Sequence, residues 1–181
     1  ESYSEFPTNS KLIVLDLITK RYHSSYDEYF LLGLNSSGDV LRFYSIDKIS
    51  DVGDEKYLSL LLDFLLDSDA ENEKSRIIKA ISRIINRSES DRENLNLITD
   101  YYKRIDKDRK IDFLSLFRQI GGKDLLNLTL DELENDDNNI RLSAIRTLSE
   151  WPGDEALEEL IKISQSYPDE KFRIIAQHGA I

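Results

Sequence analysis

The stretch that decides the fold is Asn138–Ser149 (NNIRLSAIRTLS), followed by Trp151–Asp154 (WPGD) and by Glu155–Ser164 (EALEELIKIS). Apolar residues in the first and third segments recur at the three- and four-residue spacing of an amphipathic helix. Proline and glycine in the second segment end the first helix, and Asp154 is expected to cap the next one. The stretch therefore predicts two short helices joined by a tight turn.

The same two-helix pattern recurs along the chain at steps of 31 to 35 residues. A core position of the second helix can be followed through five copies, namely Ser45, Ala80, Phe113, Ala144 and Ala176. A basic residue lies three places earlier in four of them, namely Arg42, Lys110, Arg141 and Arg173. Small core residues permit close helix approach, so Phe113 predicts a wider or tilted third repeat. A fixed period of this length is typical of helical-repeat proteins.

This pattern resembles the HEAT-repeat family, in which each unit has two helices and an arginine follows an Asp/Asn-rich turn. The best match is Arg141, Ala144, Ile145 and Leu148 followed by the WPGD turn. The resemblance implies an all-α fold, a right-handed α–α superhelix (an α-solenoid) of about five HEAT-like helix pairs plus an N-terminal helix. The chain is also similar to HEAT segments of larger bacterial exported proteins, which implies an exported or periplasmic setting and leaves a cytoplasmic one open.

We expect a single HEAT-like repeat domain over residues 1–181, because no low-complexity linker interrupts the pattern. The N-terminal helix is predicted over 9–22, and the pairs over 26–52, 54–87, 90–120, 122–150 and 154–181. The chain contains no methionine. We therefore expect it to be a piece of a longer protein.

The composition excludes several classes of function. There is no cysteine, so disulfides and thiolate metal sites are excluded. The apolar run Leu12–Ile18 is far shorter than the roughly 18 residues of a membrane span. The net charge of −11 disfavours general binding to phosphate backbones.

No catalytic pattern is present, so we expect no enzyme activity, no cofactor and no metal ligand. His23 and His178 are the only histidines and lie far apart in the sequence. The pair Gly121-Gly122 is interpreted as a helix stop. The acidic run Asp67–Glu73 lacks the glycine and the final glutamate of a calcium loop, and is interpreted as a turn with capping carboxylates. Asp136-Asp137 is interpreted in the same way.

Charge is divided between the two helices of each pair. The first-helix regions carry a net charge of −16 and the second-helix regions one of +5. In HEAT arrays the second helices line the concave face, where solenoids usually bind their partners. The resemblance therefore implies a mildly basic groove that holds a protein or an acidic peptide segment. The candidate partner-binding residues are Lys79, Arg83, Arg87, Arg118 and Arg146.

Other interpretations stay open. These cations can instead be solvated side chains paired with neighbouring glutamates. The basic stripe, or the segment Tyr101–Arg104, can contact nucleic acid, although nearby aspartates dilute its charge. The chain can also be a structural accessory domain of a larger exported enzyme. Trp151 is expected to pack near its turn rather than to be an exposed binding aromatic. The sequence predicts no oligomeric state.

Overall fold

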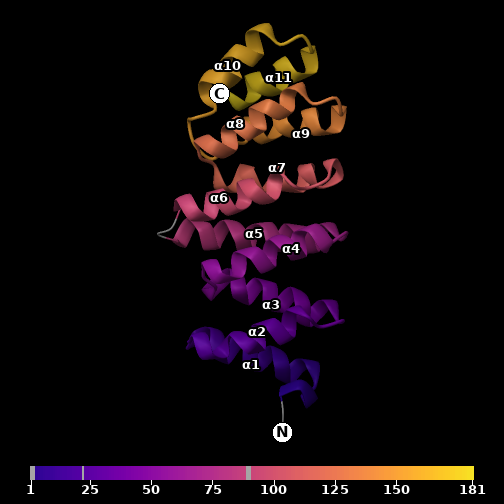
Figure 1. Ribbon diagram of the computed structural model, residues 1–181, viewed down its shortest axis with the longest axis vertical. Helices are drawn as coiled ribbons and strands as arrows, with labels where there is room; N and C mark the ends of the chain where they lie inside the picture. Colours follow the sequence, from indigo (N-terminus) through magenta and orange to yellow (C-terminus); the bar gives the residue numbers. More distant parts are fainter. Residues whose placement is uncertain (1–2, 22, 89–90) are drawn as a thin grey trace. The chain divides into compact units, whose positions relative to one another are not determined.

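The computed structural model describes residues 3–21, 23–88 and 91–181. In these ranges the chain is all-helical, with eleven α-helices, five short 3-10 helices and no strand (Figure 1). The all-α prediction is confirmed, whereas the right-handed superhelix stays a prediction. Among the described helices, none is both long enough and apolar enough to cross a bilayer.

The chain divides into two compact units, residues 1–89 and 90–181. The helices of the first unit are α1 (Thr8–Lys20), α2 (Asp27–Leu34), α3 (Asp39–Val52), α4 (Leu58–Asp67) and α5 (Glu71–Arg87). Both α1 and α2 pack against α3, and both α3 and α4 pack against α5. The 3-10 helices Tyr3–Glu5, Ser24–Tyr26 and Glu55–Tyr57 precede α1, α2 and α4.

The helices of the second unit are α6 (Asp91–Tyr102), α7 (Lys110–Ile120), α8 (Lys123–Asp131), α9 (Asn138–Ser149), α10 (Leu157–Ser166) and α11 (Glu170–Gly179). The 3-10 helix Lys107–Arg109 leads into α7, and Glu132–Glu134 extends α8. In this unit α7 packs against α9, α9 against α11, and α10 against α11. We call α3, α5, α7, α9 and α11 the second helices, because each is the second member of its predicted pair.

In the part of the chain that the structure describes, every extensive helix–helix contact within a unit joins helices at most two places apart in the sequence. The second helices of each unit are thus in contact with one another in chain order. The predicted helices all have counterparts, with ends shifted by a few residues. The single-domain assignment, in which both units belong to one uninterrupted array, stays a prediction.

The helix caps agree with the sequence at one predicted position and differ at another. Asp137 Oδ1 accepts a hydrogen bond from the backbone N–H of Asn139 at 2.7 Å, so Asp137 caps α9 as expected. The cap predicted at Asp154 is wrong, because α10 begins only at Leu157. The chain first makes an additional turn, in which the Asp154 carbonyl accepts from the Leu157 N–H at 3.0 Å.

The aligned core position is fully buried in all five copies, from Ser45 to Ala176. Ser45 satisfies its hydroxyl by donating to the Leu41 carbonyl at 2.9 Å. The large residue Phe113 packs edge-on against Phe117, with ring centroids 6.4 Å apart, and 6.0 Å from the ring of Tyr102. Phe113 thus belongs to an aromatic cluster with Phe117 and Tyr102, and the wider or tilted third repeat stays a prediction.

The repeated basic residue ties its helix to the preceding turn in two copies. Arg42 donates to the Ser36 carbonyl at 3.1 Å, and Arg173 donates to the Tyr167 carbonyl at 2.8 Å. Both acceptors lie in the turn between the first and second helix of a pair. The arginine thus donates a hydrogen bond to a backbone carbonyl in the turn, where carbonyl groups have no donor within the helix.

In the third copy the basic residue, Lys110, reaches into the next pair instead. Its ammonium group donates to the buried carboxylate of Glu132, which also accepts from Asn135 Nδ2 at 2.6 Å. Burial acts to raise the pKa of Glu132, but the hydrogen bonds from these side chains outweigh it and hold the pKa below its ordinary value. Glu132 is therefore charged in the folded state at neutral pH.

The turn between α7 and α8 depends on two consecutive glycines. Gly121 has φ 74° and ψ −160°, and Gly122 has φ 93° and ψ 148°. Residues with a side chain are essentially excluded from this region of backbone conformation. A Cβ atom at Gly121 would also lie 2.7 Å from Pro152 Cγ. The turn therefore packs closely on the turn after α9, where Trp151 is buried as predicted.

We predict that Leu148→Ala destabilises the second unit by about 2–5 kcal/mol, because Leu148 is fully buried and the change leaves a cavity. Urea unfolding followed by the fluorescence of Trp151, the single tryptophan, measures this unit. The matched control is Leu157→Ala, since Leu157 is 41% exposed on α10. Equal unfolding midpoints for the two variants would contradict the assigned core.

We predict that Glu132 makes the stability of the second unit depend on pH. A carboxyl whose folded pKa is depressed stabilises above its unfolded pKa, and this contribution is lost as the pH falls through the folded value. The stability difference between wild type and Glu132→Gln should therefore be largest above about pH 5 and shrink towards pH 3. Glu134→Gln, an exposed change on the same 3-10 turn, is the control, and a gap that does not vary with pH would contradict the prediction.

Candidate functional site

Two of the three candidate cations on α5 are used inside the first unit. Arg83 pairs with Asp51, its NH1 group lying 3.1 Å from Oδ1. Arg87 donates to the Ser50 carbonyl at 2.7 Å and to the Gly53 carbonyl at 2.9 Å. These carbonyls lie at the C-terminal end of α3, where orphan acceptors and the helix dipole favour a cation. Arg87 therefore caps a neighbouring helix.

The contact between α3 and α5 carries further ion pairs. Arg42 on α3 bonds to Glu73 on α5, and Asp47 on α3 bonds to Arg76 on α5. Lys79, by contrast, is exposed and makes no ion pair or side-chain hydrogen bond with any described residue. Of the cationic stripe predicted on α5, Lys79 alone is thus unpaired within the described part of the chain.

In the second unit the structure brings Arg118 and Arg146 together. Both line one groove between α7 and α9, with a volume of about 420 Å³. Arg118 pairs with Glu150 at 2.7 Å, and in this pair Arg118 is half-buried and Glu150 is exposed. Arg146 is exposed, and its guanidinium group makes no contact of this kind with the described residues. The predicted continuation of the α5 stripe into these two residues joins different units and stays a prediction.

The groove has lining residues that the sequence analysis did not single out. From α7 they are Ile111 and Ser115, and from α9 they are Asn139, Leu142, Ser143 and Thr147. The available signal was the helical spacing on each helix, because Ile111, Ser115 and Arg118 lie at i, i+4 and i+7. The groove therefore combines aliphatic, hydroxyl and cationic side chains on adjacent second helices.

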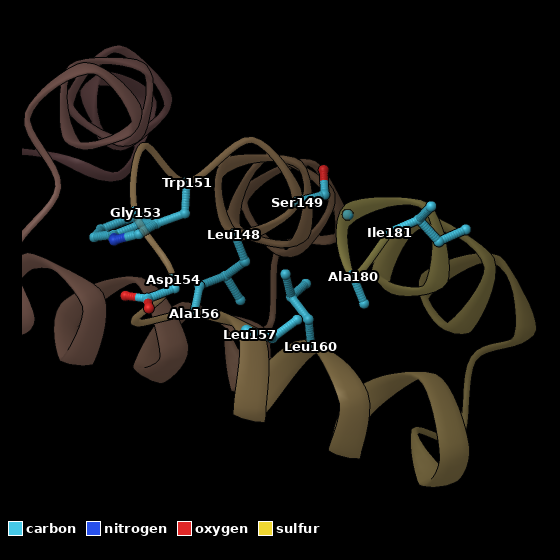
Figure 2. Close-up of a pocket in the computed structure, with 11 residues that line it drawn as sticks. Leu148, Ser149, Trp151, Gly153, Asp154, Ala156, Leu157, Leu160, Ala180 and Ile181 are labelled. Atoms are coloured by element: carbon cyan, nitrogen blue, oxygen red, sulfur yellow. The ribbon is translucent and has the colours of Figure 1, made fainter.

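A second hollow, of about 200 Å³, lies between α9, α10 and α11 (Figure 2). Leu148 and Leu160 line it, and the indole of Trp151 lies beside the Gly153–Asp154 turn. Trp151 Nε1 is buried and has no hydrogen-bond partner among the described residues. Asp154 is the one charged side chain among the residues that line this hollow, whereas two arginines line the α7–α9 groove.

The aromatic residues that suggested nucleic-acid contacts are not all available. Tyr102 is 4% exposed and packs on Phe117, with ring centroids 4.9 Å apart. Its burial, with nearby carboxylates, raises the pKa of its hydroxyl well above the ordinary value. The Lys110 ammonium lies 5.2 Å from the centroid of the same ring. Tyr102 therefore belongs to the core and presents no face on which a base could stack.

The acidic run Asp67–Glu73 has a structural explanation in the fold. Glu73 is buried, accepts from Ser68 Oγ at 2.8 Å and pairs with Arg42. Over residues 3–21, 23–88 and 91–181, no group of three or more histidine or acidic side chains is arranged to hold a metal ion.

Comparisons with models of known protein families and with curated protein sequences find no match to this chain. On the second helices, Arg83, Arg87 and Arg118 are bonded to other residues, whereas the side chains of Lys79 and Arg146 bond to no described residue.

We predict that Arg87→Ala destabilises the first unit by about 1–2 kcal/mol, because two carbonyls of α3 lose a charged donor. Hydrogen exchange of the α3 and α5 amides measures this loss. Lys79→Ala, on the same helix, should change stability by less than about 0.5 kcal/mol. If these amides are as well protected from exchange in Arg87→Ala as in Lys79→Ala, Arg87 does not cap α3.

Proposed function

We propose that the chain is a non-catalytic scaffold that binds a segment of a partner protein on the face formed by its second helices. The observation that carries the proposal is the unpaired, exposed Arg146 in the groove between α7 and α9. A cation left without a partner on a chain of net charge −11 is available for an external anion. The alternative of a purely solvated side chain is addressed by the experiment below.

The HEAT-like superhelix of about five pairs is part of this proposal. It is supported by the contacts of α3 with α5 and of α7 with α9 and α11, which follow the chain order within each unit. It is supported too by the repeated burial of the aligned core position in five copies. Extended arrays of this kind present a long surface to partners.

A protein partner fits the site better than nucleic acid. Of the candidate set, Arg83 and Arg87 are bonded to oxygens of the first unit, and only Arg118 and Arg146 line the groove. Few cations therefore remain to neutralise a row of phosphates. An acidic peptide needs only one or two such contacts, with hydroxyl and aliphatic groups supplying the rest.

The test is selection of a display library of random 12-residue peptides on the purified chain, followed by affinity measurement of the selected peptides. We predict that Arg146→Glu or Lys79→Glu weakens binding about tenfold or more, because a charge pair becomes a repulsion. The matched control is Arg104→Glu, which makes the same charge change on a side chain that is 76% exposed outside the groove.

Selected peptides that bind wild type, both variants and the control equally would refute the proposal. Binding of DNA or RNA that falls steeply with salt, in place of any peptide, would favour the nucleic-acid alternative.

A further inference from the structure

The groove between α7 and α9 has a fixed direction along which its chemistry changes. Thr147 Oγ1 donates to the Leu114 carbonyl at 3.1 Å, and Arg118 pairs with Glu150. These two links join residues 33 and 32 places apart. The two helices therefore run in the same direction, and each residue of α7 lies level with the residue of α9 about 32 places later.

This register orders the lining side chains. Ile111 lies near the level of Leu142, at the aliphatic end of the groove. Arg146 follows one helical turn further on, and Arg118, level with Glu150, follows one turn beyond that. With a rise of 1.5 Å per residue, Leu142, Arg146 and Arg118 are spaced at about 0, 6 and 12 Å along the groove.

The same spacing occurs on one face of an extended peptide. Successive residues of a strand rise about 3.3 Å, so residues i, i+2 and i+4 lie on one face at about 0, 6.6 and 13 Å. An aliphatic residue on Ile111 and Leu142 would then place the next two same-face residues at Arg146 and Arg118. Charge complementarity favours an acidic residue opposite each of the two arginines.

We infer that the α7–α9 groove binds an extended peptide segment in which an aliphatic residue and two acidic residues occupy alternate positions. The inference rests on the proposed function, because it specifies the segment that the second-helix face holds. Arg146 donates to the first carboxylate directly, since its guanidinium group bonds to no described residue. The Arg118–Glu150 pair lies at the surface, where an ion pair contributes little free energy. A ligand carboxylate can therefore share or replace the Glu150 contact.

The polar lining suits the peptide backbone between these anchors. Ser143 and Asn139 make no side-chain hydrogen bond with the described residues, so both can bond to backbone N–H and C=O groups. Ser115 Oγ donates to the Ile111 carbonyl at 3.0 Å and keeps its acceptor capacity. Among the described residues that line the groove none is aromatic, which disfavours stacked bases as its ligand.

The experiment titrates the isotope-labelled full chain with synthetic seven-residue peptides and follows the amide signals of α7 and α9 by NMR. The test peptide has leucine at position 2, glutamate at positions 4 and 6, and serine elsewhere, and a reversed peptide covers the opposite direction. A second peptide has the same composition with the leucine and glutamates contiguous. A third replaces both glutamates by glutamine.

We predict that the alternating peptide, in one of its two directions, shifts the α7 and α9 signals, and that Arg146→Glu weakens this binding about tenfold or more. Arg104→Glu should leave the affinity unchanged. Arg146 loses no bond to any residue that the structure describes, so the variant should fold, and unchanged helical circular dichroism and Trp151 fluorescence verify this.

Three results would overturn the inference. If the contiguous peptide binds as tightly as the alternating one, the spacing of the residues does not determine binding. If the glutamine peptide binds as tightly as the glutamate peptide, the negative charge does not determine binding. An oligothymidine of ten nucleotides can shift the same signals while neither alternating peptide does, which makes phosphate the ligand. The first two leave the proposed function standing if the display selection still yields peptides that depend on Arg146 or Lys79.

Discussion

Apolar side chains buried between successive second helices, α3 with α5 in one unit and α7 with α9 and α11 in the other, hold every pair in place. The α-helices have 8 to 17 residues, a length at which isolated helices are marginal in water. Each helix is therefore ordered by its neighbours. The same contacts bring charged residues of adjacent second helices within bonding distance, so packing also decides which charges are neutralised.

This coupling separates cations that look alike in the sequence. Arg87 and Arg146 both lie in the last turn of a second helix, seven and two residues after the aligned core position. Arg87 lies against the carbonyl end of α3 and donates to two backbone carbonyls, whereas Arg146 lines the α7–α9 groove and its guanidinium group bonds to no described residue. Some basic residues of the second helices thus bond to a neighbouring helix and others stay exposed, and the neighbouring helix determines which.

The all-helical structure was predictable because helical periodicity is a property of the sequence alone. The cap at Asp137 was predictable because its acceptor serves an N–H group two residues away. The cap at Asp154 failed because the additional turn before α10 has no distinctive residue pattern. The capping of α3 by Arg87 was not predictable, because its acceptors lie 34 to 37 residues away and are backbone atoms. The groove escaped prediction for a related reason: its lining joins two helices whose register only the three-dimensional structure defines.

The restriction of extensive contacts to helices at most two places apart within each unit has a kinetic consequence. Chains whose contacts are close in sequence lose little loop-closure entropy before those contacts form, and helical proteins of this kind fold in about microseconds to milliseconds. Packing of α1 and α2 on α3 requires no residue beyond Val52. On the ribosome, these three helices can therefore assemble while the rest of the chain is still being synthesised.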